Sequence, residues 1–191
     1  MPLLTPTAGS SRRFESDYYV EGYATTFDDP YVLYEYDGVQ YKEVIDRHAL
    51  DGADLSDIIF LYDHQGNVLA RKSNGTLIVE ADQKGIFVAA DLSKSTAARN
   101  MYEEISNGLV TKMSWAFKVN VDEYDRQTHT RRIKQMKKVF DVSAVSRPAN
   151  PSTDISARSW LDGAIEAEKA ERLAAQAAER KRAIIRILLE V

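Results

Sequence analysis

A period of two marks residues 112–121, where large apolar side chains alternate with small or charged ones. This alternation is typical of a β-strand that buries one face. The second face carries Ser114, a single small hydroxyl between Lys112 and Ala116. Ser114 is therefore either a small filler residue or a functional hydroxyl. The face predicted to be buried consists of Met113, Trp115, Phe117, Val119 and Val121.

Alternation, turn residues and short apolar runs predict further β-strands along most of the chain. Asp37 and Gly38 form a strong turn signal between two alternating segments, which predicts a hairpin. Residues 58–62 are a continuous apolar run of the kind found in strands buried on both faces. Residues 82–85 join two more predicted strands, and residues 131–146 form a long strand with a basic first half and an apolar second half.

Two helices are predicted. The first is capped by Ser93 or Ser95, keeps its apolar residues three or four positions apart, and ends at Asn107 and Gly108. The second spans residues 159–191, which are rich in Ala, Glu, Lys, Arg and Leu and contain no proline. Its apolar residues fit a seven-residue pattern, so we expect a long helix that packs on its own domain or on another chain.

A chain of 191 residues is long enough for one domain with appendages. We expect a flexible lead-in over residues 1–16, a single domain over residues 17–158 and the helix over residues 159–191. The N-terminal residues contain no basic segment followed by a long apolar one, so we expect neither a secretory signal nor a membrane span. The expected location is the cytoplasm of the producing cell.

Charge and cysteine content narrow the possible chemistry. The 25 Lys and Arg against 29 Asp and Glu give a formal net charge of -4, which argues against a general nucleic-acid binder. The absence of cysteine excludes disulfides, thiolate nucleophiles and thiolate metal sites. Covalent catalysis would therefore need another nucleophile, such as a serine hydroxyl activated by a base.

His64 is the best candidate for that base among the three histidines. It directly follows the apolar run of residues 58–62, at the point where the core meets a loop. His48, after a predicted strand, and His129, in a polar hairpin tip, are expected to be surface residues. Imidazole is the side chain suited to remove a serine proton at neutral pH.

A third group must then orient the imidazole, and Asp141 is the candidate. It lies among Val139, Phe140 and Val142, so it needs a hydrogen-bonding or cationic partner to compensate for burial. His64 or Lys112 could be that partner. Lys112 also leaves a serine–lysine dyad as an alternative, and Ser143 and Ser146 are rival hydroxyls in the same strand.

Five segments together resemble the prohead (capsid maturation) proteases of tailed bacteriophages, which are related to the herpesvirus assemblins. They extend from about residue 18 to residue 157 and keep the order of histidine, serine and third residue. The segments are "EGYATTF", "EVIDRHAL", "FLYDHQGNVLARKSNGTLIVEADQKGIFVAADL", "ISNGLVTKMSWAFKV" and "FDVSAVSRPANPSTDI".

The resemblance implies an α+β fold of the assemblin type: a mostly antiparallel β-barrel surrounded by helices, here with a long C-terminal helix. It implies a serine endopeptidase with His64 of "DH" as base, Ser114 of "MSWAF" as nucleophile and Asp141 of "FDVSAVS" as third residue. Relatives usually have Glu at the third position, and Gly where this chain has Ala116. Their oxyanion loop suggests backbone amides near Arg147. No cofactor or metal is implied.

The resemblance also implies a substrate and a setting. The expected substrate is the scaffolding segment of the major capsid protein, or a separate scaffold protein, followed by the protease itself, inside the assembling prohead in the host cytoplasm. We expect a homo-oligomer, with a dimer as one option, and no membrane or nucleic-acid partner. The alternative is a non-enzymatic scaffold or structural module of the virion. A third hypothesis assigns the basic residues 131–138 to nucleic-acid contact.

Overall fold

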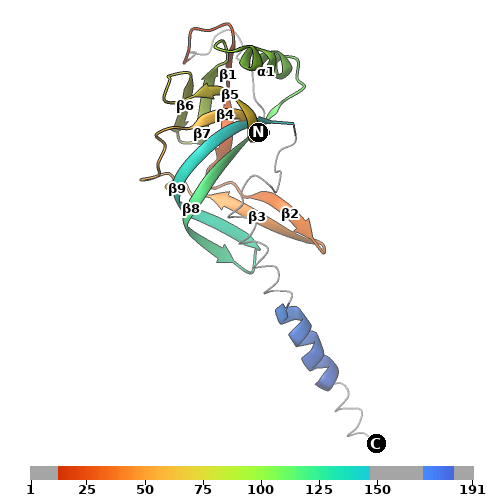
Figure 1. Cartoon of the computed structure of the whole chain (residues 1–191). Coiled ribbons are helices and arrows are strands. Elements are labelled where there is room, and N and C mark those ends of the chain that lie inside the picture. Colours follow the sequence, from red (N-terminus) through yellow and green to blue (C-terminus); the bar gives the residue numbers. More distant parts are fainter. Residues whose placement is uncertain (1–12, 147–169, 183–191) are drawn as a thin grey trace, which may run out of the picture. The chain divides into compact units, whose positions relative to one another are not determined.

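The computed structural model describes residues 13–146 and 170–182 (Figure 1). The chain divides into two units, Met1–Asp154 and Ile155–Val191, and each is described by itself. In the second unit, residues 170–182 form a helix whose side chains are all exposed. The long helix expected over residues 159–191 is therefore not shown, because only this short helix is described there and the other positions lie outside the described residues.

The first unit is α+β, with most of its described residues in two β-sheets. The smaller sheet is antiparallel, has the order β1-β7-β6, and consists of β1 (Tyr19–Thr26), β7 (Gly85–Asp91) and β6 (Leu77–Ala81). The larger sheet has the order β2-β3-β9-β4-β5, with β8 also paired to β9. Its strands are β2 (Tyr31–Tyr36), β3 (Val39–Ile45), β4 (Ile59–Tyr62), β5 (Gln65–Arg71), β8 (Lys112–Asp125) and β9 (Thr130–Val145).

The predicted α+β class with mostly β-structure is confirmed, but the expected β-barrel surrounded by helices is not found among the described residues. Their strand pairings close no barrel, and α1 (Thr96–Ser106) is the helix of the described part of the first unit. The reason lies in β9, which pairs in parallel with β3 through its first residues and in parallel with β4 through its last ones. Its other edge pairs with β8 (Figure 1). One long central strand thus holds the larger sheet together.

Strand β9 buries an apolar side chain at every third residue, although a regular strand has a period of two. The buried residues are Ile133, Met136, Val139 and Val142. Between each of these residues and the next, one residue of β9 has no partner on β8. These unpaired residues are Lys134, Lys137 and Phe140. Each β-bulge returns the next apolar residue to the core face and bends the strands, which curve visibly in Figure 1.

The predicted buried face of β8 is confirmed in its first half. Met113, Trp115 and Phe117 are buried, whereas Val121 is exposed. The pairing skips Asn120 between Val119 and Val121, so this bulge in β8 ends the simple alternation. Around Ser114, the apolar face of β8 is therefore buried as predicted, and Ser114 lies on the opposite face.

Several local predictions are also confirmed. Helix α1 is capped by Ser95, whose side chain accepts a hydrogen bond from the Ala98 backbone N–H. Asp37 and Gly38 both have positive φ, as a two-residue turn between β2 and β3 requires.

Gly85 begins β7 at a point where two backbones nearly touch. A Cβ atom at this position would lie 2.0 Å from the Thr25 carbonyl oxygen. Because that oxygen is part of the β1 backbone, it moves only if the pairing between β1 and β7 shifts. We expect Gly85→Ala to lower the free energy of unfolding by roughly 2–3 kcal/mol, as overpacking does, which urea denaturation would measure.

Gly38→Ala is the matched control for this prediction. A Cβ atom at Gly38 would meet nothing within 4 Å, so only its φ of 74° opposes the substitution. That strain costs about 1 kcal/mol. Equal losses in the two variants would mean that the close approach at Gly85 contributes nothing specific.

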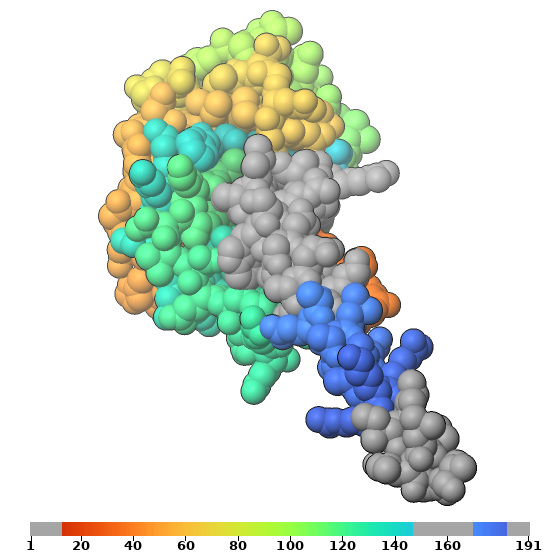
Figure 2. Space-filling view, turned by 60° about the horizontal axis from the view of Figure 1, so that its bottom comes forward, coloured from red at the N-terminus to blue at the C-terminus, as the bar shows by residue number. Residues whose placement is uncertain are grey.

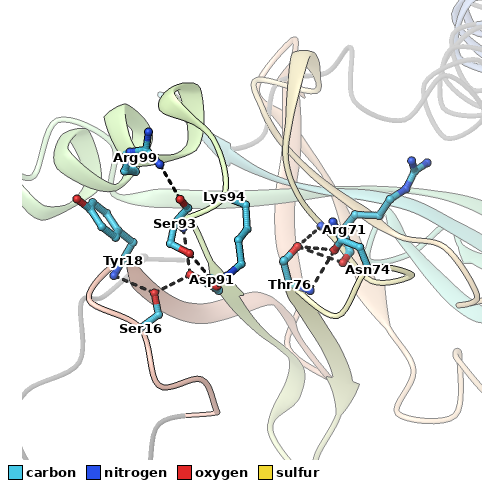
Figure 3. A network of polar contacts seen from close by, with 9 residues as sticks. All are labelled: Ser16, Tyr18, Arg71, Asn74, Thr76, Asp91, Ser93, Lys94 and Arg99. Carbon is cyan, nitrogen blue, oxygen red and sulfur yellow. Dashed lines mark hydrogen bonds and ion pairs between the residues drawn. The ribbon is translucent and has the colours of Figure 1, made fainter.

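A buried carboxylate, Asp91, ties the residues before β1 to the start of α1 (Figure 3). Its oxygens accept hydrogen bonds from the Ser16 hydroxyl at 2.6 Å and from the Ser93 backbone N–H and hydroxyl at 3.0 Å each. Lys94 Nζ lies 3.3 Å away. Burial alone would raise the pKa of Asp91, but these hydrogen bonds outweigh it and hold that pKa below its usual range.

Asp91→Asn should therefore destabilise the protein in a pH-dependent way. Because the pKa of Asp91 is lowered in the folded state, its charged form stabilises the fold at pH values above its unfolded-state pKa of about 4. This stabilisation is lost as the pH falls through the folded-state pKa. At pH 7 we expect a loss of about 1–3 kcal/mol, typical of a hydrogen-bonded buried group. Urea denaturation at pH 7 and pH 3 should show the difference from wild type shrinking at pH 3.

Asp51→Asn provides the comparison for Asp91. Its carboxylate is exposed and contacts only the exposed His48 among the described residues. Surface substitutions of this kind change stability by less than about 0.5 kcal/mol. A pH-independent loss in Asp91→Asn would contradict the role given to its charge.

Candidate active site

His64 lies in a tight turn between β4 and β5. Tyr62 pairs with Gln65, so Asp63 and His64 are the two residues of the turn, with φ of 44° and 59°. Positive φ at both positions is the geometry of a two-residue hairpin turn, but it is uncommon for histidine. The boundary position predicted for His64 is confirmed, as a tight turn.

Asp63 fastens this turn to the end of β9. Its backbone N–H donates to the Ala144 carbonyl at 2.9 Å. Its two carboxylate oxygens accept hydrogen bonds from the Ser146 backbone N–H and hydroxyl, each at 3.1 Å. These three hydrogen bonds compensate for the unfavourable positive φ angles of the turn, and they fix the position of the His64 backbone. This role of Asp63 was not predicted from the sequence, because its partner Ser146 is 83 residues away in the chain.

The His64 imidazole contacts the Asp141 carboxylate, 77 residues away in the chain. Nδ1 lies 2.7 Å from Oδ1, and the two side chains are only 14% and 10% exposed. The expectation that Asp141 has a hydrogen-bonding partner is therefore confirmed. Strand β4 pairs in parallel with β9, with Ile59 opposite Asp141. This pairing brings His64, in the turn after β4, close to Asp141.

The second ring nitrogen of His64 is available for chemistry. With Nδ1 donating to a carboxylate, the neutral imidazole carries its proton there, and Nε2 is an acceptor. Nε2 is buried and has no hydrogen-bond partner among the described residues. A buried acceptor without a partner is unfavourable, so this atom is suited to receive a proton from a ligand or a neighbouring hydroxyl.

Ser114 lies on the face of the sheet that carries this pair. It is directly opposite Ser143 across the antiparallel pairing of β8 with β9, and Ala116 is opposite Asp141. Directly opposite residues share a face, with Cβ atoms about 4.5–5.5 Å apart. The Ser143 hydroxyl is 3.4 Å from His64 Nδ1. Ser114 is therefore the neighbour, on the adjacent strand, of a residue that lies beside the imidazole. No hydrogen bond joins Ser114 to His64 among the described residues.

The β-bulge at Phe140 decides which side chains reach this face. Asp141 pairs with Ala116, whereas Val139 pairs with Phe117 and is buried in the core. Without the extra residue, Val139 would share the face of Asp141, because side chains two apart point the same way. Bulges are common beside active sites, where they redirect side chains in this manner.

The other candidate residues have different surroundings. The Ser146 hydroxyl contacts Asp63, and His48 forms an exposed pair with Asp51, as expected of a surface histidine. His129 lies in the turn after β8, with Nδ1 3.2 Å from the Tyr124 hydroxyl. Arg147, considered for the oxyanion site, lies outside the described residues.

Four of the basic residues in 131–138 form ion pairs, with acidic residues of β8, of β3 and of the loops beside it. The pairs join Arg131 to Glu43 and Asp122, Arg132 to Asp28 and Asp46, Lys134 to Glu123, and Lys138 to Asp54. Figure 2 shows the green and teal surface of β8 and β9 beside orange surface from the earlier part of the chain. These pairs compensate for most of the positive charge that a phosphate backbone would need.

Among residues 13–146 and 170–182, no group of three or more His, Asp or Glu side chains could hold a metal ion. No helix in the same residues is long and apolar enough to cross a membrane.

Comparison with protein families gives a match that covers most of the chain. A search of curated sequences finds no significant relative, and a search of solved structures finds no significant match. A family model described as caudovirus prohead serine protease matches residues 9–164, which include β4, β8, β9 and the His64–Asp141 pair. The chain thus belongs to the caudovirus prohead serine proteases, the enzymes of capsid maturation in tailed phages.

Proposed function

We propose that Ser114, His64 and Asp141 form the catalytic triad of this protease. His64 Nε2 takes the proton from Ser114 Oγ as that oxygen attacks the carbonyl carbon of the scissile peptide. Asp141 holds the imidazole with Nδ1 protonated and stabilises the imidazolium that forms. His64 then gives its proton to the leaving amine, and a water molecule, activated in the same way, releases the acyl-enzyme.

One observation carries this proposal: the 2.7 Å contact between His64 Nδ1 and Asp141 Oδ1, which leaves a buried Nε2 without a hydrogen bond. The cross-strand position of Ser114 supports its role as nucleophile, because it is opposite Ser143, beside the imidazole. Catalytic hydrogen bonds are often long in unliganded enzymes and tighten when substrate binds. Ala116, opposite Asp141, leaves room for that approach.

The proposed substrate is the scaffolding segment of the major capsid protein, or a separate scaffold protein, cleaved inside the assembling capsid. Family membership supports a capsid-protein substrate in general terms. We further propose that the protease cleaves itself and acts as a homo-oligomer. Backbone amides near Arg147 would stabilise the oxyanion, by resemblance to related proteases.

Co-expression with the capsid precursor tests this function. The intact mass of the precursor should fall by one terminal segment with the wild-type chain, and the mass difference gives the cleavage site. His64→Ala should leave the precursor intact, and His48→Ala, which alters an exposed histidine, should not. A precursor left whole by the wild type but cut by another maturation enzyme would favour a non-enzymatic scaffold module.

A further inference from the structure

We propose that Ser143 is a positioning residue of this site, whose hydroxyl fixes the Asp141 carboxylate and thereby the protonation of His64. The inference rests on the proposed role of His64 and Asp141. Ser143 thus has a role in addition to that of the nucleophile Ser114, whereas from the sequence it was only an alternative candidate for the nucleophile.

The buried Asp141 carboxylate is held by two hydrogen-bond donors. Its Oδ1 receives two donors, the Ser143 hydroxyl at 2.7 Å and His64 Nδ1 at 2.7 Å. Within the described part of the chain, these two side chains are the hydrogen-bond partners of the carboxylate. A side chain that is only 10% exposed depends on them, because a buried charge without donors is costly.

The Ser143 hydroxyl also affects which nitrogen of the His64 imidazole carries the proton. A carboxylate only accepts hydrogen bonds, so the Ser143 proton must point toward Asp141. The lone pairs of the Ser143 oxygen then remain for His64 Nδ1, at 3.4 Å. With two acceptors facing Nδ1, the tautomer protonated at Nδ1 is favoured, and Nε2 is left unprotonated as the base requires.

Ser143 is too deeply buried to be the nucleophile. Its side chain has no exposed surface, so a peptide carbonyl cannot reach it. It also lies at Nδ1, which is engaged with Asp141, rather than at Nε2. Asp141 and Ser143 are two residues apart on β9, so they share a face of the strand, and this Asp-x-Ser spacing is the signal that sequence reasoning could have used.

Ser143→Thr and Ser143→Val test the inference as a matched pair. The two side chains have nearly the same shape, so both disturb the packing equally, but only Thr keeps the hydroxyl. We expect kcat/KM for a peptide spanning the cleavage site to be roughly ten- to a hundredfold lower for Val than for Thr, as for a lost hydrogen bond to a charged group. Equal values for the two variants would overturn the inference.

A spectroscopic measurement separates this inference from the proposed function. In a Ser114→Ala background, ¹⁵N chemical shifts of the neutral His64 imidazole report which nitrogen carries the proton. We expect the Nδ1-protonated tautomer with Ser143 and with Thr, and loss of its predominance with Val. An unchanged tautomer in the Val variant would overturn the inference, even if the wild type cleaves nothing.

Two further variants guard against indirect effects. If Ser143→Val does not fold, Ser143→Ala carries the same spectroscopic test, with the same tautomer change expected. Ser93→Ala removes an equivalent bond, from a serine hydroxyl to the buried Asp91, in the other sheet. It should change neither kcat/KM nor the His64 tautomer, and a similar effect of both serines would mean that Ser143 acts only through general stability.

Discussion

Replacing Ser114 with alanine is expected to reduce peptide cleavage by about 10⁴–10⁶-fold, the range found when a serine nucleophile is removed. The hydroxyl makes no hydrogen bond to His64 in the unliganded structure, and Ser114 is only partly buried. Its loss should therefore leave the fold intact. Steady-state cleavage of a peptide spanning the cleavage site, together with a thermal melt of the same sample, measures both effects.

Lys112→Met is the informative companion to Ser114→Ala. Lys112 is two residues before Ser114 on the same strand and is opposite Val145. If His64 is the base, this variant keeps activity within a few-fold of wild type. A loss as large as that of Ser114→Ala would instead favour a serine–lysine dyad and would contradict the triad.

Asp141→Asn is expected to lower kcat by about 10⁴-fold, as the equivalent change does in other serine proteases. An amide can donate to Nδ1, so the imidazole proton would move to Nε2 and the base would be lost. Because the Ser143 hydroxyl donates to the same carboxylate oxygen, it would then face the amide nitrogen and lose its acceptor. The pH dependence of kcat should show residual activity that increases only in alkaline solution.

Asp54→Asn is the control for this change. Asp54 is an exposed carboxylate that pairs with Lys138 on the same strand, β9. Its removal should leave kcat unchanged, since surface ion pairs contribute little. Full activity in Asp141→Asn would mean that the contact between His64 and Asp141 is structural only.

The local features of this fold could be predicted from sequence because each depends on neighbouring residues. The cap at Ser95, the turn at Asp37 and the face that carries Ser114 all follow from short-range patterns. The architecture could not be predicted in the same way. The parallel pairing of β9 with β3 and β4 joins segments far apart in the chain, and it replaces the expected barrel.

The candidate site shows the same division. The chemical properties of their side chains identified His64 as a candidate base and Asp141 as the residue that orients it. Their contact, however, depends on the register of β4 against β9 and on the bulge at Phe140. Bulges break the period of two by which a strand is recognised in a sequence, and here they produce a spacing of three instead. The contacts of Asp63 with Ser146 likewise join separate elements and follow from no local pattern.

Covalent labelling tests the central claim, that Ser114 is activated by His64, without knowledge of the substrate. An alkyl fluorophosphonate modifies serine hydroxyls that a neighbouring base activates, and peptide mass mapping identifies the modified residue. The proposed triad predicts one adduct, on Ser114, which His64→Ala abolishes. An adduct on another residue, or labelling of Ser114 that persists in His64→Ala, would contradict it.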